Sequence, residues 1–168
     1  MANERPSYET LSTGYARVAS DPTEGVLGRR FVAYAVDLLM IFGLTMVFGF
    51  AILVLGVVTF GFAWMLFAIL VPGAAILYSA FTVGGPHGAP IGMRFAGLRV
   101  VDATSGARVD AVTAGVHALM FYFAAGTFVL WLVDLAIGFA RRDGRFGHDL
   151  VVNVVVIRTD AAPLPASA

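Results

Sequence analysis

The chain has 168 residues, of which 59% are hydrophobic and only 13% are charged, a composition too apolar for a water-soluble domain of this length. Its formal net charge is zero, so nothing indicates binding to nucleic acid, and the absence of cysteine excludes disulfides and thiolate metal sites. The composition therefore indicates an integral membrane protein.

The beginning and the end of the chain differ in character from the rest. Residues 1–28 are polar and of mixed charge, and they lack the apolar core of a signal peptide. We expect them to form a largely flexible N-terminal segment. The final residues, 159–168, are small or polar and should form a disordered tail. Residues 29–158 between them should form one membrane domain.

Two apolar tracts open this domain, at about residues 30–55 and 62–83. Each exceeds the roughly 20 residues that cross ~30 Å of hydrocarbon as a helix. The uncharged link 56–61 predicts a tight hairpin between them. Pro72-Gly73, within the second tract, predicts a kink rather than an end, because neighbouring groups can satisfy the freed carbonyls of a membrane helix.

A third tract, at about residues 111–140, is interrupted by the polar residues His117 and Asp134 and by the flexible Gly126. Its length does not allow two full crossings. It predicts either one long tilted helix or two half-helices that form a re-entrant hairpin.

The arginines predict the orientation in the membrane. They lie before the first tract and between the second and third tracts: Arg17, Arg29, Arg30, Arg94, Arg99 and Arg108. The first hairpin has none, so the positive-inside rule places the N-terminus and the segment 84–110 in the cytoplasm. Four more arginines follow the third tract. They lie on the same side only if that tract is re-entrant, which slightly favours the re-entrant alternative.

Two segments outside the tracts are rich in β-forming residues. The segment at about 97–110 reads as strand, turn and strand, and the segment 150–157 reads as one more strand. They can pair only if both lie on the same side of the membrane. The predicted fold is an all-α membrane protein with two transmembrane helices, a third long or re-entrant helical segment, and a small cytoplasmic β element.

Charged residues within the first tract are the strongest functional signal. Arg30, Tyr34 and Asp37 are spaced to share one helix face, with Asp37 about 10 Å deeper than Arg30. An ionised aspartate at that depth costs roughly 2.5–3.5 kcal/mol, so it needs a partner, water or a proton. One interpretation is a structural Arg30–Asp37 ion pair bridged by the Tyr34 hydroxyl. The other is a cation or proton site on a transport path.

Three stretches carry a resemblance to a known family. They are RRFVAYAVDLL (29–39), PIGMRFAGLRVVDATSGARVD (90–110) and GHDLVVNVVVI (147–157). In this order they resemble the RDD family of small bacterial membrane proteins, over about residues 25–158. The resemblance implies a location in the bacterial inner membrane, and cation or proton transport for some relatives.

The resemblance also implies which residues matter. The arginine and the two aspartates that name the family correspond to Arg30, Asp37 and Asp149. The central stretch departs from the family pattern, since Arg94 is its one retained cation. His117 stands where relatives have an arginine. These departures bear on any shared transport chemistry.

Further polar residues are secondary candidates. Asp134 and Arg141 repeat the Arg30–Asp37 spacing in inverted order, so the two aspartates could share one site. Asp149 should cap a helix or pair with an arginine, such as Arg94 or Arg99. His117 is expected to be a buried histidine with a satisfied hydrogen bond.

No residues in the sequence suggest catalysis. The histidines are too dispersed for a local metal-ligand pattern, and no nucleophile or cofactor motif is visible. We therefore expect a protein that is not an enzyme, has no cofactor, and is embedded in the lipid bilayer. Two function classes stay open: cation or proton transport as a homo-oligomer, and an accessory role within a larger membrane complex.

Overall fold

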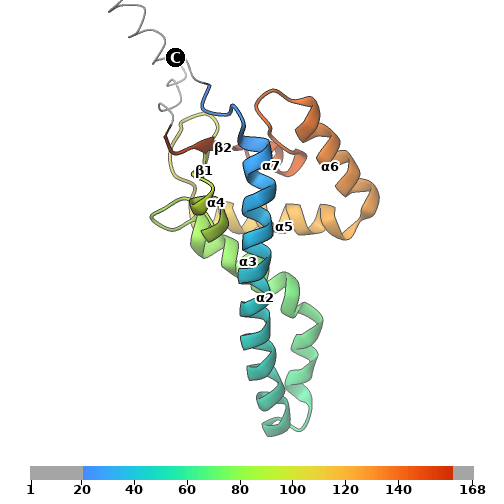
Figure 1. Ribbon diagram of the computed structural model, residues 1–168. Coiled ribbons are helices and arrows are strands. Elements are labelled where there is room, and N and C mark those ends of the chain that lie inside the picture. The colour runs from blue at the N-terminus through green and yellow to red at the C-terminus, as the bar shows by residue number, and fades with distance from the viewer. Residues whose placement is uncertain (1–20, 161–168) are drawn as a thin grey trace, which may run out of the picture.

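The computed structural model describes residues 21–160, so most of the expected flexible N-terminal segment and nearly all of the expected disordered tail lie outside the described residues. Helices predominate, and a two-stranded sheet lies near the N-terminal end of the longest one (Figure 1). The elements in chain order are α2 (Val26–Val58), the 3-10 helix η1 (Phe62–Ile69), α3 (Leu70–Val83), α4 (Ile91–Phe95), β1 (Leu98–Asp102), α5 (Ala111–Gly126), α6 (Phe128–Ala140), α7 (Gly147–Val151) and β2 (Val154–Arg158).

The first predicted tract forms α2, whose 33 residues are more than enough to cross a bilayer. Only 11% of its most apolar window is buried within the chain, so lipid or another protein must cover the rest. The predicted hairpin follows and turns through left-handed backbone at Phe60 and Gly61. Gly56 is required there, because a Cβ would lie 1.7 Å from the Trp64 indole nitrogen.

The second tract forms a candidate span of 22 residues, which matches the prediction of 62–83. Its helix type changes from 3-10 to α at Leu70. Pro72 lies in the first turn of α3, where a proline is tolerated because the amides there have no partner within the helix. The irregularity predicted from Pro72-Gly73 therefore precedes the proline.

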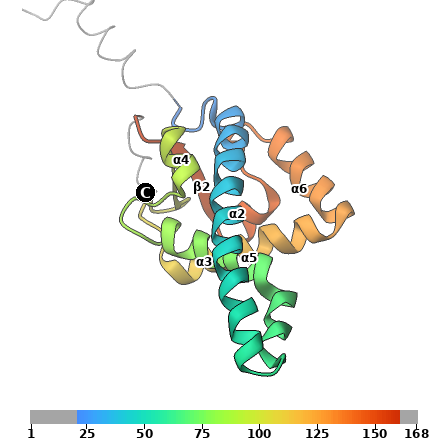
Figure 2. The same ribbon diagram turned by 60° about the horizontal axis from the view of Figure 1, so that its bottom comes forward.

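The third tract is divided into α5 and α6, which meet at a bend of 119°. Figures 1 and 2 show this bent arm, with α5 passing behind α2 and α6 standing to one side of α2, turned back toward the sheet. β1 precedes this arm and β2 follows it, and the two strands pair antiparallel, from Leu98 with Arg158 to Asp102 with Val154. The arm therefore brings the chain back to the sheet. The structure adopts the two-half-helix alternative.

The β segments are shorter than predicted. The second arm of the segment 97–110 makes one isolated bridge, between Val101 and Arg108. The segment 150–157 becomes a strand only at Val154, because the chain before it forms α7 and then turns at Asn153, whose φ is 53°. Helix α7 forms because the Asp149 side chain accepts a hydrogen bond from the Phe146 amide at its own N-terminus.

The main hydrophobic core lies at the sheet end of the molecule. It joins the first turn of α2 to both strands, with Val26, Leu98, Val100, Val154 and Val156 all buried. This packing fixes the sheet and the short helix α7 beside the first turns of α2. As a result, residues near the end of the chain lie next to Arg30.

Candidate functional site

Arg30 forms a bidentate ion pair with Asp149. Its NH1 lies 2.6 Å from Oδ2 and its NH2 lies 3.1 Å from Oδ1. Arg30 is 8% exposed and Asp149 is fully buried. The guanidinium also lies 4.4 Å from the Phe146 ring centre and donates to the Gly144 carbonyl. The predicted Arg30–Asp37 pair is therefore wrong.

Asp149 has a full set of donors. Besides Arg30, the Phe146 amide donates to Oδ2 at 2.9 Å, and the His117 Nε2 lies 2.7 Å from Oδ1. Burial opposes ionisation of this carboxyl, but the Arg30 charge and the hydrogen bonds from His117 and Arg30 hold its pKa below the usual range.

The predictions about Asp149 and His117 are confirmed in part. Asp149 does cap a helix and pair with an arginine. The named partners Arg94 and Arg99 are wrong, because α7 packs beside the start of α2, and the Arg94 Nε donates instead to the Ala89 carbonyl. His117 is the mostly buried, hydrogen-bonded histidine that we expected.

Asp37 is held by neutral donors from two other elements. The Tyr78 hydroxyl of α3 and the Gly92 amide of α4 each donate to its Oδ1 at 2.7 Å. The approach of α4 is close: a Cβ on Gly92 would lie 2.1 Å from the Ala33 carbonyl oxygen. Within residues 21–160, Asp37 forms no ion pair.

Tyr34 does not bridge Arg30 to Asp37. Its ring instead packs edge-on against Phe121 of α5, with 5.5 Å between ring centres. The Tyr78 hydroxyl takes the place expected for Tyr34, and it also accepts a hydrogen bond from the Ile91 amide. The sequence analysis missed Tyr78, although a tyrosine in a mostly apolar helix could have indicated a buried hydrogen-bond donor.

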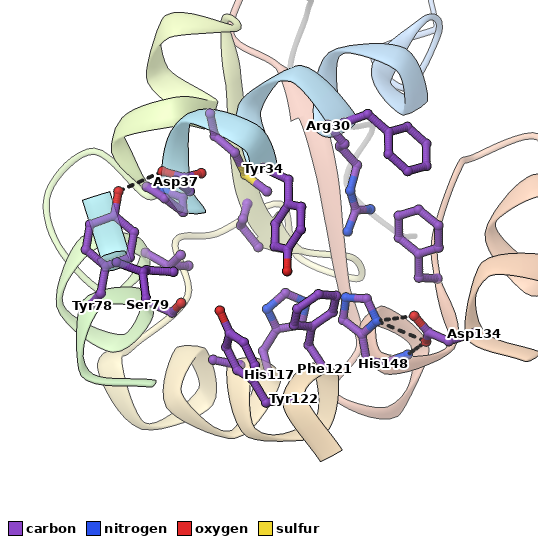
Figure 3. Close-up of a pocket in the computed structure, with 18 of the residues that line it drawn as sticks. Arg30, Tyr34, Asp37, Tyr78, Ser79, His117, Phe121, Tyr122, Asp134 and His148 are labelled. Atoms are coloured by element: carbon purple, nitrogen blue, oxygen red, sulfur yellow. Dashed lines mark hydrogen bonds and ion pairs between the residues drawn. The ribbon is translucent and has the colours of Figure 1, made fainter. Parts of the chain in front are cut away.

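Asp134 pairs with His148. The carboxylate accepts the His148 backbone amide at 2.8 Å and faces the Nδ1 of its ring at 2.8 and 2.9 Å. Arg141, whose spacing from Asp134 repeats that of Arg30 and Asp37, forms an ion pair with Asp143. Figure 3 shows Asp37 and Asp134 on opposite sides of a cavity. The two aspartates therefore line one cavity from opposite sides, and each has hydrogen-bond partners of its own.

The cavity between them has a volume of about 330 Å³ and is lined mainly by α2, α3, α5, α6 and α7, with Met93 of α4 and Val100 of β1. Aromatic side chains make up much of its wall (Figure 3). The polar groups that reach it include Tyr34, Asp37, Tyr78, His117, Asp134 and His148. It is large enough for several waters, each of which occupies about 30 Å³ in the liquid. An ion could therefore enter together with part of its hydration shell.

Two histidines that are far apart in the sequence meet at the edge of this cavity. The rings of His117 and His148 have centres 4.9 Å apart. One ligand atom from each, together with one from Asp149, lie within 4.8 Å of one another. No local spacing in the sequence indicated this group, because α5 supplies one histidine and α7 the other.

A comparison with protein families finds the RDD family, matched by residues 25–153. The chain belongs to the RDD family. With its two apolar helices of spanning length, it is an RDD membrane protein. No curated protein and no solved structure matches it. Of the three RDD residues, Arg30 and Asp149 bind each other, whereas Asp37 lies apart with neutral partners.

Proposed function

We propose that this RDD protein takes part, without catalysis, in moving a cation or a proton across the membrane. The observation that supports this proposal is the environment of the Asp37 side chain. It lines the cavity from within a membrane helix, and it has no ion-pair partner among the described residues. A carboxylate within a membrane helix needs a partner, water or a proton, and the two partners of Asp37 are neutral. In this proposal, a proton or a cation reaches Asp37 through the cavity.

Arg30 and Asp149 have a structural role in this proposal. They neutralise each other in a buried pair, so they hold α7 against α2 rather than carry the transported ion. At Asp37 the hydrogen bonds from Tyr78 and Gly92 both end on Oδ1. A proton or small cation at Oδ2 therefore leaves both bonds intact.

A single chain supplies only part of a transport path. Residues 21–160 contain two helices of full spanning length and one bent pair, whereas carriers that alternate access usually use larger repeated bundles. We propose that a second copy of the chain, or a larger complex, covers the exposed apolar surface of α2. The arginine distribution supports a cytoplasmic N-terminus. The family match supports a location in the bacterial inner membrane.

Transport is tested in vesicles that contain the purified protein and a pH-sensitive dye, under gradients of Na⁺, K⁺ and Li⁺. Asp37→Asn keeps an oxygen for Tyr78 and Gly92 but removes the exchangeable charge, and we expect it to abolish cation-dependent proton movement. Asp160→Asn, at an exposed site near the end of the described chain, is the matched control and should behave as wild type. A silent wild-type protein under all three gradients would contradict transport.

The Arg30–Asp149 pair itself favours a second candidate function, an accessory role in a larger complex. A buried and satisfied pair stiffens a domain without any exchange of ions. On this alternative, the protein extracted with its native lipids copurifies with a larger membrane complex. Wild type and Asp37→Asn would then be equally silent in vesicles.

A further inference from the structure

We propose that His117, His148 and Asp149 bind a divalent transition-metal ion such as Zn²⁺. Their ligand atoms lie within 4.8 Å of one another, on two elements that the fold brings together. The sequence alone predicted no metal site, because the histidines are dispersed along the chain. This proposal is independent of ion transport at Asp37, which lies on another part of the cavity wall (Figure 3).

The two histidines converge on one oxygen. The His117 Nε2 lies 2.7 Å and the His148 Nε2 lies 3.5 Å from the Asp149 Oδ1. Ligands at 2.0–2.1 Å from a tetrahedral Zn²⁺ are about 3.3 Å apart. The 3.5 Å distance is close to this spacing, whereas the 2.7 Å hydrogen bond would have to lengthen. The ion would take the place of the proton shared by His117 and Asp149. Small side-chain rotations would bring the two histidine nitrogens together.

The ligands are already oriented by other groups. The Nδ1 of His148 bonds to the Asp134 carboxylate, which leaves its Nε2 directed toward Asp149. A carboxylate on the far nitrogen of a histidine is the usual support of a metal ligand. On Asp149, Arg30 NH1 and the Phe146 amide hold Oδ2, so Oδ1 faces the histidines.

The local charge also suits a cation. Two carboxylates, Asp134 and Asp149, stand against one guanidinium, Arg30, around the two imidazoles. The Arg30 NH2, 3.1 Å from Oδ1, is the one contact that opposes an ion and must turn away. Two imidazoles and one carboxylate suit Zn²⁺ or Co²⁺ better than Mg²⁺ or Ca²⁺, which prefer oxygen ligands. Since both histidines line the cavity, water can complete the coordination.

The test uses the full chain without a histidine tag, stripped with chelator in detergent and titrated with Co²⁺. We expect one ion per chain, visible ligand-field absorption bands, and displacement by Zn²⁺. His117→Ala and His148→Ala should abolish the bands, and Asp134→Asn should weaken binding by roughly 10-fold or more. His87→Ala is the matched control, because this exposed histidine lies outside the cluster, and it should bind as wild type.

Each outcome of the titration decides the proposal. Wild-type protein that shows no Co²⁺ bands, or bands that survive in both His117→Ala and His148→Ala, would overturn it. His117→Gln guards against loss of fold, because its amide can still donate to Asp149 while no imidazole remains; it should melt near wild type and bind no Co²⁺. The vesicle assay for Asp37 contains no transition metal. A negative result in that assay therefore leaves the metal proposal standing, and a negative titration leaves the transport proposal standing.

Discussion

Arg30 in the second turn of α2 and Asp149 in α7 form a buried bidentate ion pair across 119 residues of chain. Together with the pairing of β1 with β2, this contact ties the end of the domain to its beginning. One arginine and one distant aspartate therefore act as a single structural unit of this chain. The third RDD residue, Asp37, is left available for another role.

The first prediction concerns this pair. Asp149→Ala should lower the free energy of unfolding by roughly 3–5 kcal/mol, because it leaves the buried Arg30 without its counter-charge. Asp143→Ala is the matched control: it breaks the partly exposed Arg141–Asp143 pair and should cost less than about 1 kcal/mol. The free energies of unfolding of both variants are measured in detergent and compared with that of the wild type. Equal losses in both variants would show that burial of the first pair has no energetic weight.

The second prediction concerns the hydrogen bonds to Asp37. Asp37→Ala removes the acceptor shared by Tyr78 and the Gly92 amide, so it should destabilise the domain by ~1–3 kcal/mol. Asp37→Asn keeps one oxygen at the same place and should melt close to wild type. Thermal melts of the three proteins compare these effects directly. A wild-type melting temperature for Asp37→Ala would mean that these bonds do not hold α4 to α2.

The third prediction tests how closely α4 packs on α2. Gly92→Ala should destabilise the domain by about 1–3 kcal/mol, since its Cβ would lie 2.1 Å from the Ala33 carbonyl oxygen and would force the helices apart. Gly43→Ala, at an exposed site of α2 with open space around it, should be neutral or slightly stabilising. The two variants carry the same chemical change, so the difference between their melting temperatures measures the effect of the close contact between Gly92 and Ala33. Equal melting temperatures would contradict this prediction.

The fourth prediction is topological. A reporter fused after Ile157 should lie on the same side of the membrane as one inserted at Ser105, and on the opposite side from one inserted at Phe60. The reason is that β1 and β2 pair across the bent α5–α6 arm. Alkaline phosphatase and fluorescent-protein fusions report the side. Opposite sides for Ile157 and Ser105 would require the arm to cross the membrane completely.

Much of the fold could be predicted from local patterns. Apolar length predicted α2 and the second span, and the combination of His117, Gly126 and Asp134 predicted that the third tract could divide. The β-branched residues predicted a strand near the end of the chain. The predicted strand began too early, at residue 150. The hydrogen bond from the Phe146 amide to Asp149 caps the helix α7, which occupies the residues just before the strand β2.

The site could be predicted as a set of residues but not as a set of contacts. Helical spacing placed Arg30 and Asp37 on one face, and no local pattern could show that Asp149 competes for Arg30 with better geometry. The partners of Asp37 and Asp134 come from α3, α4 and α7, so they depend on how the elements pack. Tyr78 and His148 were missed as partners for the same reason.

Proton release on cation binding tests most directly the claim that Asp37 is the exchange site. Purified protein in weakly buffered detergent solution is mixed with Na⁺, K⁺ or Li⁺ while the pH is recorded. We predict that wild type releases protons with at least one of these cations and that Asp37→Asn releases none. Equal proton release by both proteins, or none by wild type with any of the three cations, would contradict the account.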